Sequence, residues 1–357
     1  MNLEVNGFNV LNIILVPFVT SLLLVPLIKK VAIHINAIDI PNERKVHKDP
    51  IPRIGGLAIF IAFLLGYILY GQVSTQMLSV LIGGFIIILT GIVDDIKPIL
   101  AKYKFLCQTV SATIVVVYGK LFFSNITLLG LNLVFPTWIN MILSIIFIVA
   151  IINAINLIDG LDGLASGISS IYFLTIAVLG FALNKLGGLD IILSLIMTGS
   201  TLGFLVHNFP PAKIFMGDTG SMFLGFMIAV IALLGYKVAT ITSLIIPILI
   251  LFIPIFDTIV AIIRRTLKHE SIGKPDKEHL HHQLLRMTSS PTKTILIIYF
   301  INSVFAAISV LFVLGDNKQA IALYVIVMIF FIFLLLKTNI LFEHKKGKDN
   351  RKWKQYL

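Results

Sequence analysis

The chain has 357 residues, of which 58% are hydrophobic and 13% are charged, and its formal net charge is +11. Soluble domains carry about 25% charged residues, so this composition and its long uncharged runs exclude a soluble protein and indicate an all-α polytopic membrane protein. Basic residues beside membrane spans orient those spans, and no nucleic-acid partner is expected. The single cysteine, Cys107, excludes an intramolecular disulfide.

Apolar segments long enough to cross a bilayer recur along the whole chain. A spanning helix needs about 20 mainly apolar residues, and eleven segments approach that length. The predicted spans are 9–28, 55–71, 77–93, 105–123, 138–155, 164–183, 189–206, 221–235, 241–263, 294–314 and 319–336. Residues 1–8 carry no positive stretch before the first apolar run, so no cleavable signal peptide is expected.

The lysines and arginines predict the orientation of these spans. With the N-terminus outside and the C-terminus in the cytoplasm, 24 of the 28 Lys and Arg residues lie in inward-facing segments, as the positive-inside rule requires. We therefore expect a single transmembrane domain, 1–336, and a basic cytoplasmic tail, 337–357, that contacts anionic membrane lipids. The cytoplasmic connections are 29–54, 94–104, 154–163, 207–220 and 264–293.

The acidic residues are placed as unevenly as the basic ones. Of the 17 Asp and Glu residues, only Glu4, Asp190 and Asp316 fall in outward-facing segments, and Asp257 lies within a predicted span. A charged side chain at the bilayer centre costs about 2.5–3.5 kcal/mol on insertion scales. Acids gathered at the cytoplasmic ends of spans therefore indicate chemistry at that face. A secondary transporter would place its acids nearer the midplane.

The first cytoplasmic connection combines Asp39, several cations including Arg53, and the pair Gly55-Gly56. One interpretation is a linker anchored at the membrane surface. The other is a set of cations that binds the phosphate of a lipid or a nucleotide. The sequence alone leaves both open.

The third span ends in the acidic pair Asp94-Asp95. Successive residues of a helix point about 100° apart, so the two carboxylates are expected to have different partners. Close like charges raise one pKa unless a cation neutralises them, which makes one acid a candidate base and the other a candidate partner of a metal ion or a lysine. The alternative is an acidic helix end with Lys97, Lys102 and Lys104 as membrane anchors, but acids are unfavourable at the C-terminus of a helix.

The fifth span closes with Asn153, Asn156, Asp159 and Asp162, each three residues after the last. The two asparagines share a helix face, and the glycines that follow each aspartate permit a tight reversal. This connection contains no Lys or Arg, so its carboxylates are expected to meet a metal ion or a substrate. The alternative is a capped turn.

The eighth span opens with the segment Gly217-Asp218-Thr219-Gly220. The glycines permit close backbone approach, and the helix N-terminus that follows is expected to attract phosphate. Asp218 is a candidate Mg²⁺ ligand, because hard cations prefer carboxylate oxygen and keep positions for substrate phosphates. The alternative is a simple N-cap.

The last cytoplasmic connection combines Arg264 and Arg265 with the segment His279-Leu280-His281-His282. Zinc is not favoured, because no cysteine lies nearby. A basic, histidine-rich loop suits a nucleotide diphosphate. The alternative, an ordinary positive-inside loop, explains the cations and leaves the histidines unexplained.

At these residues the sequence resembles the polyprenyl-phosphate N-acetylhexosamine-1-phosphate transferases, the superfamily of WecA and TagO, to which MraY is more distantly related. The resemblance runs in order from Asp39 to about Leu285 and includes the segment from Pro254 to Thr258. The histidine segment is similar to the WecA/TagO branch, since MraY-like members carry three successive histidines. Gln283 is a departure, because many members have arginine there.

The resemblance implies an eleven-span fold in the bacterial plasma membrane and transfer of N-acetylglucosamine 1-phosphate, or a close N-acetylhexosamine 1-phosphate, from a UDP-sugar to undecaprenyl phosphate. UMP is released, and this is the first membrane step of cell-envelope polysaccharide or teichoic acid synthesis. Asn156 and Asp218 are implied ligands of Mg²⁺, for which Mn²⁺ is a substitute. The other implied roles are catalytic for Asp94, Asp95, Asp159 and Asp162, and substrate-binding for Arg53, Lys104, Asn153, Arg265, His279, His281 and His282.

Asp94 is the expected base that deprotonates or orients the lipid phosphate, and Asp95 is expected to pair with Lys104 or to approach the metal through water. Direct attack by the lipid phosphate and a phospho-aspartyl intermediate are both open, and direct attack is favoured because the acceptor is already an oxyanion. The alternatives are an MraY-like phospho-N-acetylmuramoyl-pentapeptide transferase and, more remotely, a secondary transporter. A homodimer is compatible with the transferase prediction.

Overall fold

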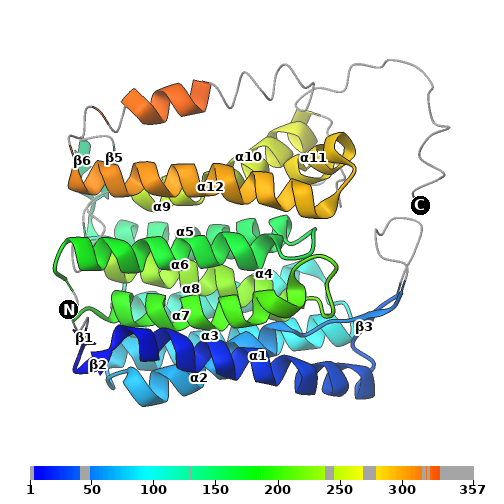
Figure 1. The fold of residues 1–357 in the computed structure, drawn as a ribbon. Helices are drawn as coiled ribbons and strands as arrows, with labels where there is room; N and C mark the ends of the chain where they lie inside the picture. Colours follow the sequence, from blue (N-terminus) through cyan, green and yellow to red (C-terminus); the bar gives the residue numbers. More distant parts are fainter. Residues whose placement is uncertain are drawn as a thin grey trace.

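A computed structural model describes residues 4–40, 49–124, 126–128, 131–185, 187–237, 245–267, 279–315, 319 and 322–329. Nearly all regular structure in these ranges is helical (Figure 1). The helices are α1 Val10–His34, α2 Gly56–Tyr70, α3 Thr75–Ile96, α4 Ala101–Thr113 continued by the π-helical turn η1 Ile114–Tyr118, α5 Thr137–Ile158, α6 Leu164–Ala182, α7 Leu189–Asn208, α8 Gly217–Lys237, α9 Ile245–Ile250, α10 Phe252–Leu267, α11 Leu280–Thr288 and α12 Pro291–Leu314. Three short antiparallel hairpins join β1 Glu4–Val5 to β2 Phe8–Asn9, β3 Ile38–Asp39 to β4 Ile51–Pro52, and β5 Ile126–Leu128 to β6 Leu131–Leu133.

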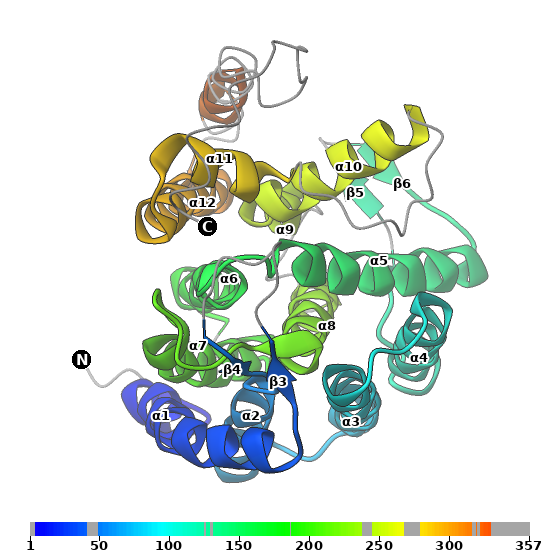
Figure 2. The ribbon, with the colours of Figure 1, turned by 90° about the vertical axis from the view of Figure 1, so that its right-hand side faces the viewer.

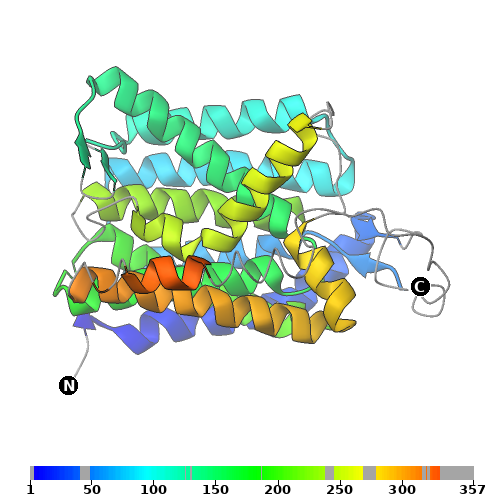
Figure 3. The same ribbon diagram turned by 90° about the horizontal axis from the view of Figure 1, so that it is seen from above.

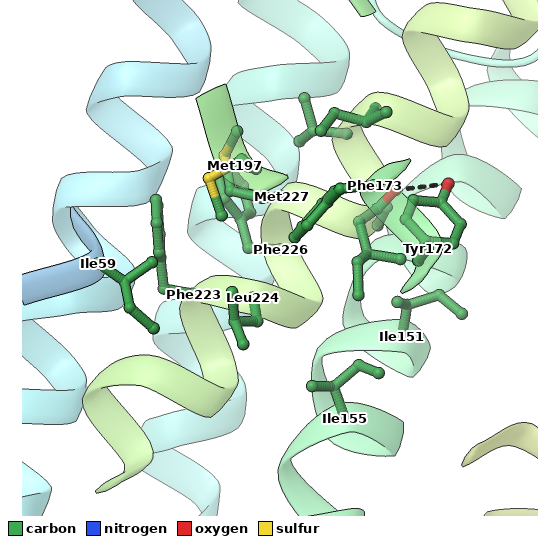
Figure 4. Close-up of a cluster of buried hydrophobic side chains, with 14 of the residues drawn as sticks. Ile59, Ile151, Ile155, Tyr172, Phe173, Met197, Phe223, Leu224, Phe226 and Met227 are labelled. Atoms are coloured by element: carbon green, nitrogen blue, oxygen red, sulfur yellow. Dashed lines mark hydrogen bonds between the residues drawn. The ribbon is translucent and has the colours of Figure 1, made fainter. Parts of the chain in front are cut away.

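Helix α8 lies at the centre of the bundle, with α2, α3, α5, α6 and α7 around it (Figure 2). Its sequence is apolar on every face, which is the pattern of a helix that no solvent or lipid reaches, and 94% of its most apolar window is buried. Phe223 and Phe226 of α8 pack among the side chains of the surrounding helices (Figure 4). The central helix therefore has little freedom to move, and its N-terminus is a fixed point.

Glycines allow α2 and α3 to approach the first turn of α8 at backbone distance. A Cβ at Gly56 of α2 would collide with the backbone of Gly220, and a Cβ at Gly91 of α3 would collide with the backbone of Thr219. Inside a membrane, small residues of this kind drive helix association, because lipid tails offer no competing hydrophobic effect. The close approach expected at Gly220 is confirmed.

Seven of the described helices are long and apolar enough to cross a membrane, and α2 is a shorter apolar helix. This supports the polytopic all-α prediction. The seven are α1, α3, α5, α6, α7, α8 and α12, and each overlaps one predicted span. The prediction of eleven spans and of outside and inside termini stays a prediction. The tail 337–357 and half of the span 319–336 lie outside the described residues.

The described part of the span predicted over 241–263 is not one continuous helix, because the structure divides it into α9 and α10 at Leu251. Pro254 explains the break. Proline has no N–H to donate to the carbonyl of Ile250, and its ring collides with that carbonyl in a continuous helix. Beyond the break, α10 crosses α5 obliquely (Figure 3).

The polar segments that the sequence singled out meet at one end of the bundle, around the N-terminus of α8. The β3–β4 hairpin, the C-terminal ends of α3 and α5, and the N-terminus of α11 all lie at this end (Figures 1 and 2). Hydrogen bonds and ion pairs described below join them across large sequence separations. The expectation that the acids gather at one face is confirmed.

Candidate active site at the N-terminus of the central helix

A carboxylate from α3 holds the N-terminus of α8. Asp95 accepts hydrogen bonds from the backbone N–H groups of Asp218 and Thr219, both at 3.0 Å, and from the Thr219 hydroxyl at 2.7 Å. Gly217 begins α8 at φ 70°, and a Cβ there would collide with the Asp95 carboxylate. Asp95 therefore caps α8. The amides of Asp218 and Thr219, which the sequence suggested for phosphate, are already bonded to it.

Arg53 is the cation that faces Asp95. Its Nη2 atom lies 3.2 Å from Asp95 Oδ1, and its Nη1 atom lies 3.6 Å from Asp39 Oδ1. Backbone hydrogen bonds to the segment before α8 fix the position of Arg53. The Phe215 N–H donates to the Pro52 carbonyl at 2.8 Å, and the Gly55 N–H donates to the Phe215 carbonyl at 2.9 Å. The guanidinium of Arg53 therefore pairs with a buried carboxylate, and its expected substrate-binding role stays a prediction.

Lys104, from α4, connects two carboxylates. Its Nζ atom lies 2.8 Å from Asp218 Oδ2 and 3.1 Å from Asp94 Oδ2. Burial lowers the pKa of Lys104, but the Asp218 and Asp94 carboxylates outweigh that effect and raise it overall, so the ammonium is charged at neutral pH. Asp94 also accepts the N–H of Ile99 at 2.9 Å.

The acidic pair thus has divided partners, as predicted. Asp94 faces α4 and its lysine, whereas Asp95 faces α8 and Arg53. The expected pairing of Asp95 with Lys104 is wrong, because successive residues of α3 point about 100° apart and only Asp94 is on the side of Lys104.

Asn156 lies beside Asp218, as the metal prediction requires. Its Nδ2 atom donates to the Ser221 hydroxyl at 2.8 Å, and its amide also bonds to the Asp218 carboxylate. These bonds use the N–H groups of the amide and leave the Oδ1 atom as an acceptor. One carboxylate and one amide oxygen from neighbouring helix ends fit the donor preference of Mg²⁺.

Asn153 lies one turn deeper in α5 and is bonded inside the bundle. Its Nδ2 atom donates to Gln108 Oε1 at 2.7 Å and to the Val149 carbonyl at 2.8 Å. Gln108 in turn contacts the sulfur of Met222. The structure therefore places Asn153 in a contact between α4, α5 and α8, and its expected substrate contact stays a prediction.

The two aspartates after α5 have different surroundings. Asp162 Oδ2 accepts the N–H of Ala212 at 2.9 Å and so holds the connection between α7 and α8. Asp159 is half-buried and accepts no hydrogen bond from the described residues. Burial, followed by the charges of Asp218 and Asp95, raises the pKa of Asp159 to about 8. Without a bound cation, this carboxyl group is mostly protonated at neutral pH.

The histidine segment packs on the same turn. The ring of His281 lies against Gly160, where a Cβ would collide with its Nε2 atom. Burial, with the neighbouring His282 ring as a further cause, lowers the pKa of His281 to about 3, so His281 is neutral and cannot serve as a cation for phosphate. His282 is half-exposed, and Arg265 is buried on α10. Residues 268–278 of this loop lie outside the described residues.

Two residues to which the sequence analysis assigned no role, Asn208 and Asp257, organise this end of the bundle. Asn208 accepts the N–H of Gly163 at 3.0 Å and donates to the Ile214 carbonyl at 3.0 Å, so it joins the start of α6 to the start of α8. Asp257 bonds to the histidine segment. A buried acid within an apolar span was the available signal for Asp257, and a lone asparagine at the end of α7 offered none.

The chain is similar to a known protein family and to several named enzymes. Residues 77–236 match the family described as glycosyl transferase family 4. A probable undecaprenyl-phosphate N-acetylglucosaminyl 1-phosphate transferase of Bacillus subtilis is 42% identical over 345 residues, which cover 96% of this chain and 93% of that protein. The decaprenyl-phosphate N-acetylglucosaminephosphotransferase of Mycobacterium tuberculosis is 34% identical over 332 residues, or 84% of this chain and 82% of that protein. An undecaprenyl-phosphate alpha-N-acetylglucosaminyl 1-phosphate transferase of Haemophilus influenzae is 32% identical over 310 residues, or 84% and 85%.

Proposed function

The chain belongs to glycosyl transferase family 4, among the polyprenyl-phosphate N-acetylglucosamine-1-phosphate transferases, and from that membership we propose that it transfers N-acetylglucosamine 1-phosphate from UDP-N-acetylglucosamine to undecaprenyl phosphate and releases UMP. The observation that carries the proposal is the position of Asp218 at the buried N-terminus of α8, in contact with both Lys104 and Asn156. An MraY-like activity is not favoured, because the relatives are named for N-acetylglucosamine transfer.

Asp218 and Asn156 are the residues that would hold Mg²⁺. A bound Mg²⁺ would supply positive charge that neutralises the diphosphate of the donor. The Lys104 ammonium lies 2.8 Å from Asp218 Oδ2, so it would have to leave that oxygen for a cation to bind there. Lys104, released from Asp218, would then be available to bind a phosphate oxygen.

In the proposed reaction, an oxygen of the lipid phosphate attacks the β-phosphorus of the UDP-sugar. A new phosphorus–oxygen bond forms, the bond from that phosphorus to the bridging oxygen breaks, and UMP leaves with that oxygen. A phosphate monoester has a second pKa near 6, so the acceptor is already mostly a dianion at neutral pH. Asp94, whose Oδ2 atom lies 3.1 Å from Lys104 Nζ, would position that oxyanion indirectly, by holding the lysine ammonium that attracts it.

Direct attack is better supported than a phospho-aspartyl intermediate. Both oxygens of Asp94 and both oxygens of Asp95 already accept hydrogen bonds, and an attacking carboxylate would have to give up one of them. Asp159 is protonated at neutral pH in the metal-free site and is a poor nucleophile. Asp95 and Arg53, which hold α8, are assigned positioning roles in this proposal.

In the proposed topology, the end of the bundle that carries Asp94, Asp218 and His281 faces the cytoplasm. There a soluble nucleotide-sugar and a membrane lipid phosphate can meet. The proposed location is the bacterial plasma membrane, with eleven spans, the N-terminus outside and the C-terminus in the cytoplasm. A secondary transporter is disfavoured, since these carboxylates gather at one end of the bundle.

The test is UMP release by purified protein in detergent with UDP-N-acetylglucosamine, undecaprenyl phosphate and Mg²⁺. We expect release to need the lipid and the metal and to stop in Asp218→Ala. UMP release should also fall in Lys104→Ala, for which Lys102→Ala is the matched control. Lys102 lies two residues away, and its ammonium lies 5.1 Å from the centroid of the Tyr103 ring instead of at the site. Release with another UDP-sugar would keep the reaction type and change the donor, and no release with any donor would overturn the proposal.

A further inference from the structure

A buried carboxylate of α10 bonds to the histidine segment across more than twenty residues of sequence. Asp257 Oδ2 lies 3.0 Å from His279 Nδ1, and Asp257 Oδ1 accepts the N–H of Leu280 at 2.9 Å. The side chains of Asp257 and His279 are each 6% exposed. His279 is the N-cap of α11 and its own side chain makes no capping bond. Asp257 therefore supplies from another helix the acceptor that the N-terminus of α11 lacks.

The geometry also defines the tautomer of His279. A carboxylate only accepts hydrogen bonds, so the bond between Asp257 and His279 requires the proton on Nδ1. The Nε2 atom is then the nitrogen of His279 that can accept a hydrogen bond, or donate one when the ring is protonated. An imidazole oriented by a carboxylate is a common arrangement where a histidine binds a metal ion or transfers a proton.

The orientation of His279 is passed on to the turn of the active site. The rings of His279 and His281 are stacked, with centroids 5.6 Å apart and planes 6° apart. His281, in turn, lies against Gly160, next to Asp159. A tilt of the His279 ring would therefore displace His281 and the turn that it covers.

We propose that Asp257 is a positioning residue of the transferase, which fixes the Nδ1–H tautomer and the ring plane of His279 and thereby seats the histidine segment on the Asp159–Gly160 turn. The inference rests on the proposed function, because its kinetic test uses that reaction. The competing account is that Asp257 only caps α11.

Two substitutions separate these accounts. In Asp257→Asn, the amide oxygen can still accept the N–H of Leu280, but the amide nitrogen donates to His279 and reverses its tautomer. The Asp257→Asn variant therefore keeps the cap of α11 and loses the Nδ1–H tautomer of His279. In His279→Asn, the amide nitrogen takes the place of Nδ1 and can still donate to Asp257, whereas the Nε2 atom is deleted.

We expect Asp257→Asn to lower kcat about 10- to 100-fold, the range seen when an orienting partner is removed, with little change in KM and in melting temperature. We expect the double variant Asp257→Asn/His279→Asn to be no slower than His279→Asn alone, because Asp257 acts through the His279 ring that His279→Asn has removed. Thr266→Ala, an exposed position on α10 whose hydroxyl bonds within its own helix, is the control. Losses in kcat that multiply in the double variant, or an Asp257→Asn enzyme with normal kcat, would overturn the proposal.

A spectroscopic measurement decides the tautomer without using activity. In ¹⁵N-histidine-labelled protein, the signals that disappear in His279→Asn identify His279. We expect a protonated Nδ1 and an unprotonated Nε2 in the wild type, and the reverse in Asp257→Asn. A wild-type His279 with its proton on Nε2 contradicts the inference. If the wild type releases no UMP with any UDP-sugar, the proposed function fails while this measurement still decides the positioning of His279.

Discussion

The substitution Asp95→Asn distinguishes an anchor of α8 from a catalytic carboxylate. The Asp95 side chain is fully buried, receives three hydrogen bonds from Asp218 and Thr219, and lies 3.2 Å from the Arg53 guanidinium. An asparagine amide presents one acceptor oxygen instead of two, so its nitrogen would face either the Asp218 N–H and Arg53 or the two Thr219 donors. Breaking a buried charge pair by removing one partner costs about 3–5 kcal/mol, and because Arg53 is partly exposed, we expect a loss of about 3 kcal/mol.

Asp94→Asn is the matched comparison, because the neighbouring residue undergoes the same change and is equally buried. Asparagine at position 94 can still accept the N–H of Ile99, and Lys104 keeps its contact with Asp218. We expect Asp94→Asn to cost about 1 kcal/mol, a typical net hydrogen bond, and to lose turnover. Unfolding in mixed detergent micelles, followed by far-ultraviolet circular dichroism, gives both free energies. An Asp95→Asn protein as stable as wild type but inactive would refute the assignment of Asp95 as an anchor.

Three further outcomes are expected. Lys104→Ala should lower UMP release about 10²–10³-fold, the effect of losing one preorganised donor, while Lys102→Ala leaves it unchanged; equal losses in both variants would point to membrane anchoring. Gly160→Ala should displace His281 and lower both activity and melting temperature, whereas Gly187→Ala should do neither, because a Cβ there would make only an ordinary 3.8 Å contact with Asn6 Oδ1. A Gly160→Ala enzyme with normal activity would show that the histidine contact is unimportant. The free energy of unfolding should fall as the pH drops from about 6.5 toward 3. In that range His281 binds a proton in the unfolded chain but not in the folded chain, where its pKa is about 3. Denaturation at each pH should show a shallower fall in His281→Gln, and an unchanged pH profile in that variant would contradict a neutral, buried His281.

Hydropathy and charge were sufficient to predict the class of fold and the end of the bundle that holds the site. Apolar runs and polar clusters are properties of local sequence. Because a charged side chain inside the bilayer costs free energy, Asp94 and Asp218 are confined to the ends of their helices. The separate partners of Asp94 and Asp95 also followed from local geometry, because successive helix residues diverge by about 100°.

The identity of those partners depends on tertiary structure and was not predictable. Asp95 reaches the amides of Asp218 and Thr219 only because Gly91 lets α3 touch the backbone of α8. Likewise, Asp257 reaches His279 from α10, which begins after the helix break before Pro254, whereas the sequence was interpreted there as one continuous span. Glycine and proline positions carried this information, but their effect is legible only once the neighbouring helix is known.

The most direct test of the proposed transferase is UMP release at fixed UDP-N-acetylglucosamine and undecaprenyl phosphate, measured as Mg²⁺ is removed with EDTA and then restored. We predict that release stops on removal, returns on restoration, and is absent at every Mg²⁺ concentration in Asp218→Ala protein that keeps its wild-type helix content. Release that persists without Mg²⁺, or in Asp218→Ala, would contradict the central assignment of a metal-assisted phosphoryl transfer at the N-terminus of α8.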